Sequence, residues 1–141
     1  MRVVIINGIG GSGKDTFVEK CQEILQKACC LNISTVDFVK EVAKYCGWDG
    51  TKTPENRKFL SDLKDLLTEW DDIPLKKIMA EAVSCSACAE ILGELDNSVL
   101  FIHCREPKEI EKFKIEFKDK FFHIASHIRY EDIEPEIKEK F

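Results

Sequence analysis

The sequence predicts an α/β protein with a parallel sheet of about four strands flanked by helices. Two observations carry this prediction. Short, unbroken apolar runs alternate with longer segments of helical periodicity, and the first run leads directly into a glycine-rich loop. Strands that alternate with helices pair in parallel through right-handed crossovers, and ligands bind at the carboxyl ends of those strands. We therefore expect a single domain over residues 1–141, with its functional site at that edge of the sheet.

The composition is typical of a soluble globular chain. Hydrophobic residues make up 44% of the 141 residues, which is enough for one substantial core. The net charge of −5, with no basic run, argues against a nucleic-acid partner. The apolar runs are too short to cross a bilayer, so no membrane association is expected. Because no signal peptide precedes the first strand, we expect a cytoplasmic protein whose seven cysteines are reduced thiols.

The first strand and the loop after it form the most informative stretch. Residues 2–7 contain the run Val3-Val4-Ile5-Ile6, which is typical of a strand buried on both faces. Residues 8–16 then show the Gly-x-x-x-x-Gly-Lys spacing of a P-loop, or Walker A motif. Glycines let consecutive backbone N–H groups approach phosphate oxygens, the next helix adds its dipole, and Lys14 adds a mobile charge that also serves catalysis. The residues predicted to bind the phosphates of ATP are Gly8, Gly10, Gly11, Ser12, Gly13, Lys14, Asp15 and Thr16.

The residue after the P-loop lysine departs from the usual pattern. That position normally holds Ser or Thr, whose hydroxyl binds Mg²⁺, whereas here it is Asp15, with Thr16 next. A carboxylate is a good ligand for a hard cation, but it also repels phosphate. The sequence therefore predicts a site that uses Mg²⁺ and leaves its ligand open between Asp15 and Thr16.

The next elements follow from periodicity and capping signals. A helix is expected from Gly13 to about Ala28, followed by a strand over residues 31–36. Asp37 is then the expected N-cap of a short helix that ends at Gly47. Its place after the second strand makes Asp37 equally a candidate for contact with a ligand, so both interpretations stay open.

Two longer helices come next. Pro54 opens the first of them, at a position where its missing N–H costs nothing, and Pro74 opens the second, which should stop at Gly93. Arg57 and Lys64 share one face of the first helix and are candidates for binding an anionic ligand, the alternative being a solvated helix face. The apolar stripe of the same helix comprises Phe59, Leu60, Leu63, Leu66, Leu67 and Trp70.

The third strand is expected over residues 98–104, again continuous and apolar. Arg105 directly follows it, at the edge of the sheet where a ligand should lie. We therefore predict that Arg105 binds a phosphate group. The alternative is a surface ion pair with Glu106 or Glu109.

The last predicted elements are a helix that begins at Pro107, a fourth strand over residues 121–125 and at most a short helix over residues 134–141. Cys85-x-x-Cys88 is interpreted as structural, because no second Cys or His pair stands at zinc spacing and because it lies inside a helical pattern.

Three segments resemble a known family. Gly13-Lys14-Asp15-Thr16 looks like the variant P-loop of the deoxynucleoside monophosphate kinases of phages and bacteria, which animal phosphomevalonate kinases share. Residues 102–109 are similar to that family's strand end, and residues 57–65 resemble a helix of small adenylate-kinase-like P-loop kinases. The resemblance covers roughly residues 1–110. It implies a three-layer P-loop NTPase fold and ATP-dependent phosphoryl transfer to a nucleoside or deoxynucleoside monophosphate, with Mg²⁺. In such a reaction the candidates for binding the acceptor are Asp37, Arg57, Lys64 and Arg105, and Arg105 would act with Lys14 in catalysis by neutralising charge during transfer.

The sequence departs from this family in two places. The family usually has an acid two residues before the strand-end arginine, like a Walker B carboxylate, whereas His103 stands here and is a poor Mg²⁺ ligand. After residue 125 only Arg129 occupies the place of a lid arginine, so we expect a C-terminally shortened fold. Such a fold should bind Mg-ATP but show weak transfer or appreciable ATP hydrolysis as a monomer.

Two other functions remain open at this stage. One is a nucleotide-binding module that holds or slowly hydrolyses NTP, and the other is a kinase of a non-nucleotide phosphorylated metabolite. A GTPase switch would carry an Asn-Lys-x-Asp-like motif and an Asp-x-x-Gly motif, and the sequence has neither, which favours the kinase. The sequence identifies neither the base nor the sugar of the acceptor, nor the oligomeric state.

Overall fold

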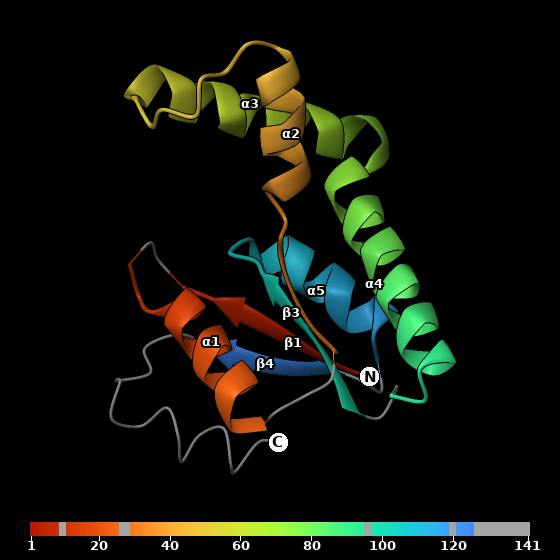
Figure 1. Cartoon of the computed structure of the whole chain (residues 1–141). Coiled ribbons are helices and arrows are strands. Elements are labelled where there is room, and N and C mark those ends of the chain that lie inside the picture. Colours follow the sequence, from red (N-terminus) through yellow and green to blue (C-terminus); the bar gives the residue numbers. More distant parts are fainter. Residues whose placement is uncertain (9–10, 26–28, 95–96, 119–120, 126–141) are drawn as a thin grey trace. The chain divides into compact units, whose positions relative to one another are not determined.

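Figure 1 shows the computed structural model, which describes residues 1–8, 11–25, 29–94, 97–118 and 121–125. Its fold class is α/β, with a four-stranded sheet in the order β2-β3-β1-β4. The elements in chain order are β1 (Arg2–Asn7), α1 (Lys14–Leu25), β2 (Cys29–Ser34), α2 (Asp37–Tyr45), α3 (Pro54–Asp71), α4 (Ile73–Ile91), β3 (Ser98–His103), α5 (Pro107–Glu116) and β4 (Phe121–Ala125). The chain divides into two compact units, which we call the sheet unit (Met1–Ile33 with Ser84–Phe141) and the helical unit (Ser34–Val83).

The sheet is built around β1, which pairs in parallel with both β3 and β4. The apolar runs of β1 and β3 are buried along their whole length, which confirms the prediction of strands covered on both faces. In register, Ile6 lies opposite His103, and Asn7 lies opposite Ala125. The ends of β3 and β4 therefore lie beside the point where β1 leads into the glycine-rich loop.

Alternate residues of the strands face the two helices of the sheet unit. Figure 1 shows α1 and α5 on opposite faces of the sheet. Phe17, Val18 and Cys21 of α1 form one buried cluster with Val4, Ile6, Val99 and Phe101 of the sheet. Ile110 and Phe113 are the buried residues of α5. The sheet unit thus has a helix–sheet–helix arrangement, compatible with the expected layered fold.

The second strand and the helix after it differ in detail from the prediction. β2 begins and ends two residues earlier than expected, at Cys29 and Ser34. The prediction that Asp37 is the N-cap is wrong. Val36 holds that position, and Asp37 is the first residue of α2. The physical reason is that the Asp37 carboxylate accepts a hydrogen bond from the backbone N–H of Ser34, at 2.7 Å, and so stabilises the turn before the helix.

The predicted helix stops are confirmed where they rest on glycine. Gly47 follows the C-cap of α2 with a φ of +98°, and Gly93 follows α4 with a φ of +70°. The left-handed region is open to glycine without steric cost, so each residue ends its helix. α1 ends at Leu25, and the predicted extension to Ala28 lies outside the described residues, as do Arg129 and residues 134–141.

The start of α3 is also confirmed. Thr53 is its N-cap and accepts a hydrogen bond from the backbone N–H of Asn56, at 3.2 Å, while Pro54 is the first helical residue. The apolar stripe of α3 does not form a core: within the described part of the chain, no residue of this helix is buried. No helix among the described residues combines the length and apolarity that a membrane crossing would need.

Candidate functional site: the loop between β1 and α1

The glycine-rich loop needs glycine at defined positions. Gly11 and Gly13 have φ values of +77° and +81°, in the left-handed region that other residues avoid. A Cβ at either position would meet no atom within 4 Å, so backbone conformation, not crowding, makes glycine necessary. Ile9 and Gly10 lie outside the described residues. The described glycines of the motif thus shape a tight turn between the end of β1 and the first turn of α1.

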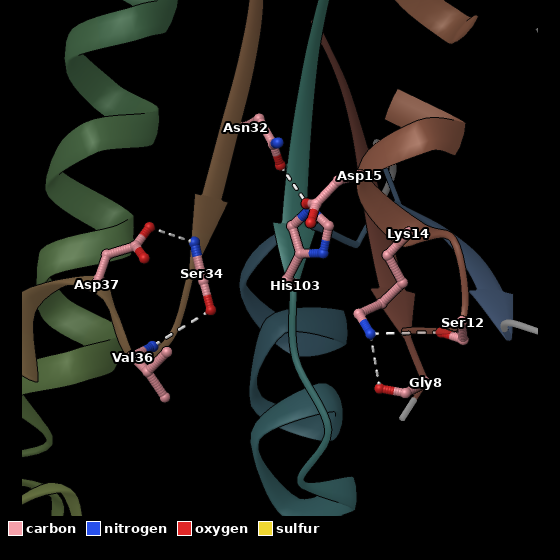
Figure 2. A network of polar contacts seen from close by, with 9 residues as sticks. All are labelled: Gly8, Ser12, Lys14, Asp15, Asn32, Ser34, Val36, Asp37 and His103. Carbon is pink, nitrogen blue, oxygen red and sulfur yellow. Dashed lines mark hydrogen bonds and ion pairs between the residues drawn. The ribbon is translucent and has the colours of Figure 1, made fainter. Parts of the chain in front are cut away.

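Lys14 folds back over this loop, as Figure 2 shows. Its Nζ donates hydrogen bonds to the backbone oxygen of Gly8, at 3.0 Å, and to Oγ of Ser12, at 3.4 Å. The carbonyl and the hydroxyl are neutral acceptors, which a stronger anionic acceptor can replace. The side chain is therefore held inside the loop in a position from which it can move to a bound phosphate.

Two cations interact at this edge of the sheet. Burial lowers the pKa of Lys14, and the positive charge of Arg105 lowers it further, whereas the Asp15 carboxylate raises it. Arg105 follows the end of β3 and is exposed. Glu109, in the next helix, accepts a hydrogen bond from Sγ of Cys104, at 3.4 Å. Arg105 is thus placed at the strand end, where its charge acts on Lys14.

His103 occupies a part of the site that sequence reasoning left without a role. Its side chain is 13% exposed, and its Nε2 lies 3.9 Å from Oδ1 of Asp15, whose side chain is 87% exposed. The same Nε2 lies 2.6 Å from Oδ1 of Asn32 in β2. An amide oxygen only accepts, so Nε2 carries the proton of this hydrogen bond. Asn32, His103 and Asp15 therefore converge from β2, β3 and α1 (Figure 2).

Asn32 is the residue that sequence reasoning missed. A polar side chain between Leu31 and Ile33, near the carboxyl end of an apolar strand, was the signal that could have identified it. His103 was noticed only as the occupant of an expected acidic position. Because β2 and β3 are neighbours in the sheet, the tertiary structure brings these two polar side chains together.

The residues beside the loop fit a magnesium ion that is shared with a phosphate. Mg²⁺ in nucleotide sites is typically held by one or two protein ligands, by waters and by substrate phosphates. Asp15 offers an exposed carboxylate in the first turn of α1, and the neighbouring Thr16 is half-buried. Among the described residues, no group of three or more His, Cys, Asp or Glu side chains could hold a metal ion alone. A magnesium ion at Asp15 or Thr16 would take its other ligands from water or from a bound phosphate.

The three remaining acceptor candidates, Asp37, Arg57 and Lys64, belong to the helical unit. Asp37 accepts the hydrogen bond from Ser34 described above, which gives it a structural role. Arg57 Nε donates to the backbone oxygen of Lys52, at 3.1 Å, and its side chain is exposed. Lys64 is half-buried on the same helix. Lys14, Asp15 and Arg105, in contrast, all belong to the sheet unit.

Comparison with known proteins adds no family to this description. No protein-family model matches the chain, and a search of curated proteins found no match either. The function must therefore be argued from the loop, from the charged residues around it and from the fold that positions them.

Proposed function

We propose that this protein binds Mg-ATP at the loop between β1 and α1 and transfers the γ-phosphoryl group to a nucleoside or deoxynucleoside monophosphate. The proposal includes a P-loop NTPase fold for the sheet unit. One observation carries it: Lys14 Nζ lies against the backbone oxygen of Gly8 and Oγ of Ser12, in a loop shaped by the left-handed Gly11 and Gly13, and Arg105 follows the neighbouring strand. Two like charges repel each other, and an anion that binds both relieves that repulsion.

The chain's own residues divide the work of transfer. Phosphoryl transfer depends mainly on positioning and on neutralising charge at the transferred group. The loop and the first turn of α1 hold the donor phosphates, and Lys14 moves from Gly8 and Ser12 to their oxygens. Arg105 pairs with the acceptor phosphate through its planar guanidinium group. Mg²⁺, when bound, neutralises phosphate charge, and Asp15 and Thr16 are the residues that would hold it.

The test is a transfer assay in which donor and acceptor are followed separately. Purified protein is incubated with Mg-ATP and a panel of nucleoside and deoxynucleoside monophosphates, and ADP release is compared with acceptor phosphorylation. We expect phosphorylation of one group of monophosphates, slow in the monomer and accompanied by some ADP release without transfer. Lys14→Ala should abolish transfer while circular dichroism shows an intact fold, since Lys14 is needed for charge neutralisation. Near-normal turnover by this variant would contradict the assignment of the loop.

The variant Arg105→Ala distinguishes binding of the acceptor from binding of ATP. It should raise the acceptor KM by about tenfold or more, because a charge-assisted bidentate pair is lost. The ATP Kd, measured by calorimetry, should change much less. Arg2→Ala is the matched control, because it removes another arginine of the sheet unit, at the opposite end of β1. A rise confined to the ATP Kd would assign Arg105 to the donor.

A second candidate function rests on His103. A strand-end carboxylate usually supports the metal of a P-loop kinase, whereas here an imidazole lies 3.9 Å from Oδ1 of Asp15. This arrangement favours a module that binds NTP and hydrolyses it slowly without an acceptor. ADP release at the same rate with and without every acceptor would support that function. Transfer to a phosphorylated metabolite instead would identify a non-nucleotide kinase.

A further inference from the structure

On the face of the sheet beneath α1, the apolar rows of two strands end in polar side chains. Phe101 of β3 and Cys30 of β2 pack in one apolar cluster with this helix. Side chains two residues apart in a strand share a face, so His103 and Asn32 continue these rows beyond the cluster. Asp15, in the first turn of α1, lies beside them (Figure 2). An imidazole, an amide and a carboxylate therefore meet at the edge of the sheet where the glycine-rich loop begins.

The hydrogen bond to Asn32 determines which nitrogen of His103 carries the proton. At a pH of about 8.5 an ordinary imidazole is neutral and has one N–H group. Nε2 lies 2.6 Å from the amide oxygen of Asn32, which can only accept, so this nitrogen is the donor. Asp15 Oδ1, at 3.9 Å from Nε2, is too far away to take over that proton. Nδ1 therefore carries a lone pair and acts as an acceptor.

The strand order places this acceptor on the side of the loop. β2 lies on one side of β3, and β1 lies on the other. In Figure 2, Nε2 is directed toward Asn32 of β2, and Nδ1 lies on the side of the ring that faces Lys14. Lys14 folds over the loop that follows β1. Phosphate oxygens are acceptors themselves, so the partner of Nδ1 in a ligand bound at the loop must be a donor.

We infer that Nδ1 of His103 accepts a hydrogen bond from water that hydrates a magnesium ion at Asp15, and that Asn32 is the positioning residue that fixes the imidazole for this contact. Mg²⁺ in proteins retains several waters, and partners of this kind influence metal affinity. An imidazole is a poor direct ligand of Mg²⁺, but it can accept from the ion's water. Asp15 is exposed beside His103, so such water lies close to the ring. The inference rests on the proposed binding of Mg-ATP.

The tautomer can be measured on the protein alone. Nitrogen-15 NMR at a pH of about 8.5 should show His103 with its proton on Nε2, and the variant His103→Phe identifies its signals among those of the three histidines. With a non-hydrolysable ATP analogue bound, added Mg²⁺ should shift the Nδ1 signal toward that of a hydrogen-bonded nitrogen, whereas the analogue in a chelator should not. A proton on Nδ1, or an Nδ1 signal that Mg²⁺ leaves unchanged, would overturn the inference.

Two substitutions of His103 test the acceptor directly. Asparagine places an oxygen near the position of Nδ1, whereas phenylalanine keeps a ring without any acceptor. His103→Phe should raise the Mg²⁺ concentration for half-maximal ADP release by about tenfold, and His103→Asn by much less. Asn32→Leu should raise it as well, but not further in a His103→Phe background, because Asn32 acts through His103. Asn97→Leu is the matched control, since it removes an amide just before the opposite end of β3.

The outcomes distinguish this inference from the proposed function, provided that circular dichroism shows each variant folded. If the wild type neither binds ATP nor releases ADP, the proposed function fails, and with it the role of His103 toward Mg²⁺. If the wild type is active and His103→Phe leaves its Mg²⁺ requirement unchanged, only the inference fails. A higher acceptor KM at an unchanged Mg²⁺ requirement would assign Nδ1 to the acceptor and overturn the inference as well. Effects of Asn32→Leu and His103→Phe that simply add would overturn the role of Asn32.

Discussion

At the scale of single residues, the candidate site places opposite charges next to each other, on Lys14 and Asp15 in the first turn of α1. Lys14 is bound to the loop through Gly8 and Ser12, and its pKa is lowered by burial and by Arg105. Asp15, the next residue, counteracts that shift and faces His103. An aspartate beside the phosphate site opposes anion binding unless a cation lies between them. The effects of Lys14 and Asp15 on ligand affinity can therefore be measured separately, through the dependence on pH and on Mg²⁺.

The lowered pKa of Lys14 predicts how ATP binding depends on pH. The polyphosphate favours the charged amine, so the pKa of Lys14 is higher in the complex than in the free protein. Between these two pKa values, binding takes up a proton, and the affinity for ATP falls as the pH rises. Calorimetry across the alkaline range should show this fall. Lys14→Arg should remove it, because a guanidinium group keeps its charge at such pH; the same slope in both proteins would contradict the assignment.

The charge of Asp15 predicts opposite effects of one variant in the presence and absence of metal. Asp15→Ala should bind ATP more tightly than the wild type in a chelator, because a repulsive carboxylate is removed. It should also need a higher Mg²⁺ concentration, by about tenfold, for half-maximal activity, because a ligand is lost. Thr16→Val tests the alternative ligand. An unchanged Mg²⁺ titration in Asp15→Ala would move the metal to Thr16.

At the scale of elements, local capping signals position the helices. Thr53 caps α3 and Pro54 follows it, so the start of this helix is determined by two adjacent residues. Hydrogen bonds also fix the loop before this helix. Asp49 Oδ1 accepts from the backbone N–H of Thr51, at 2.9 Å. Asn56, in the first turn, donates from Nδ2 to Oγ1 of Thr51, at 2.7 Å. The helix therefore begins at a well-determined point, although its apolar side is uncovered.

The cap of α3 gives a stability prediction. Thr53→Ala removes the acceptor for the Asn56 N–H and should lower the free energy of unfolding of the helical unit by about 1 kcal/mol. Thr53→Ser keeps the hydroxyl and should lie close to the wild type. Urea denaturation followed by circular dichroism measures both variants. If Thr53→Ser were as destabilised as Thr53→Ala, the hydroxyl would not be the cause.

At the scale of the whole molecule, most of the core lies in the sheet unit, while Val39, Ala43, Ile78 and Ala82 are buried in the helical unit. β1 and β3 are buried between helices, and Cys21 of α1 lies in the same core cluster. Burial, and to a lesser degree the neighbouring Cys30, raises the pKa of the Cys21 thiol to about 12. A thiol reacts through its thiolate, so Cys21 is protected twice, by the lack of access and by its protonation state.

Cys21 therefore reports on the global opening of the sheet unit. At pH 8 a thiol reagent should modify the exposed Cys46 and Cys88 quickly and Cys21 only at the rate of unfolding. Mass spectrometry of digested protein follows each site over time, and added denaturant should accelerate mainly the buried sites, Cys21 and Cys104. Modification of Cys21 as fast as that of Cys46 would show that this core opens locally.

Much of the fold follows from short stretches of sequence. The runs Val3–Ile6 and Val99–Ile102 predict buried strands, and the glycines at 11 and 13 predict the turn between β1 and α1. Gly47 and Gly93 predict where two helices stop. These features depend on backbone conformation, hydrophobic periodicity and capping, which are properties of a few neighbouring residues.

The remaining features were decided by the tertiary structure. The contact between His103 and Asn32 depends on β2 and β3 being neighbours, and the interaction of Arg105 with Lys14 depends on the register of β3 beside β1. The apolar stripe of α3 was visible in the sequence, yet only the structure showed that Phe59, Leu66 and Trp70 of this stripe are exposed. Periodicity shows which side of an element is apolar. What lies against that side is determined by residues far away in the chain, because strand order and packing are set by burial of the whole core.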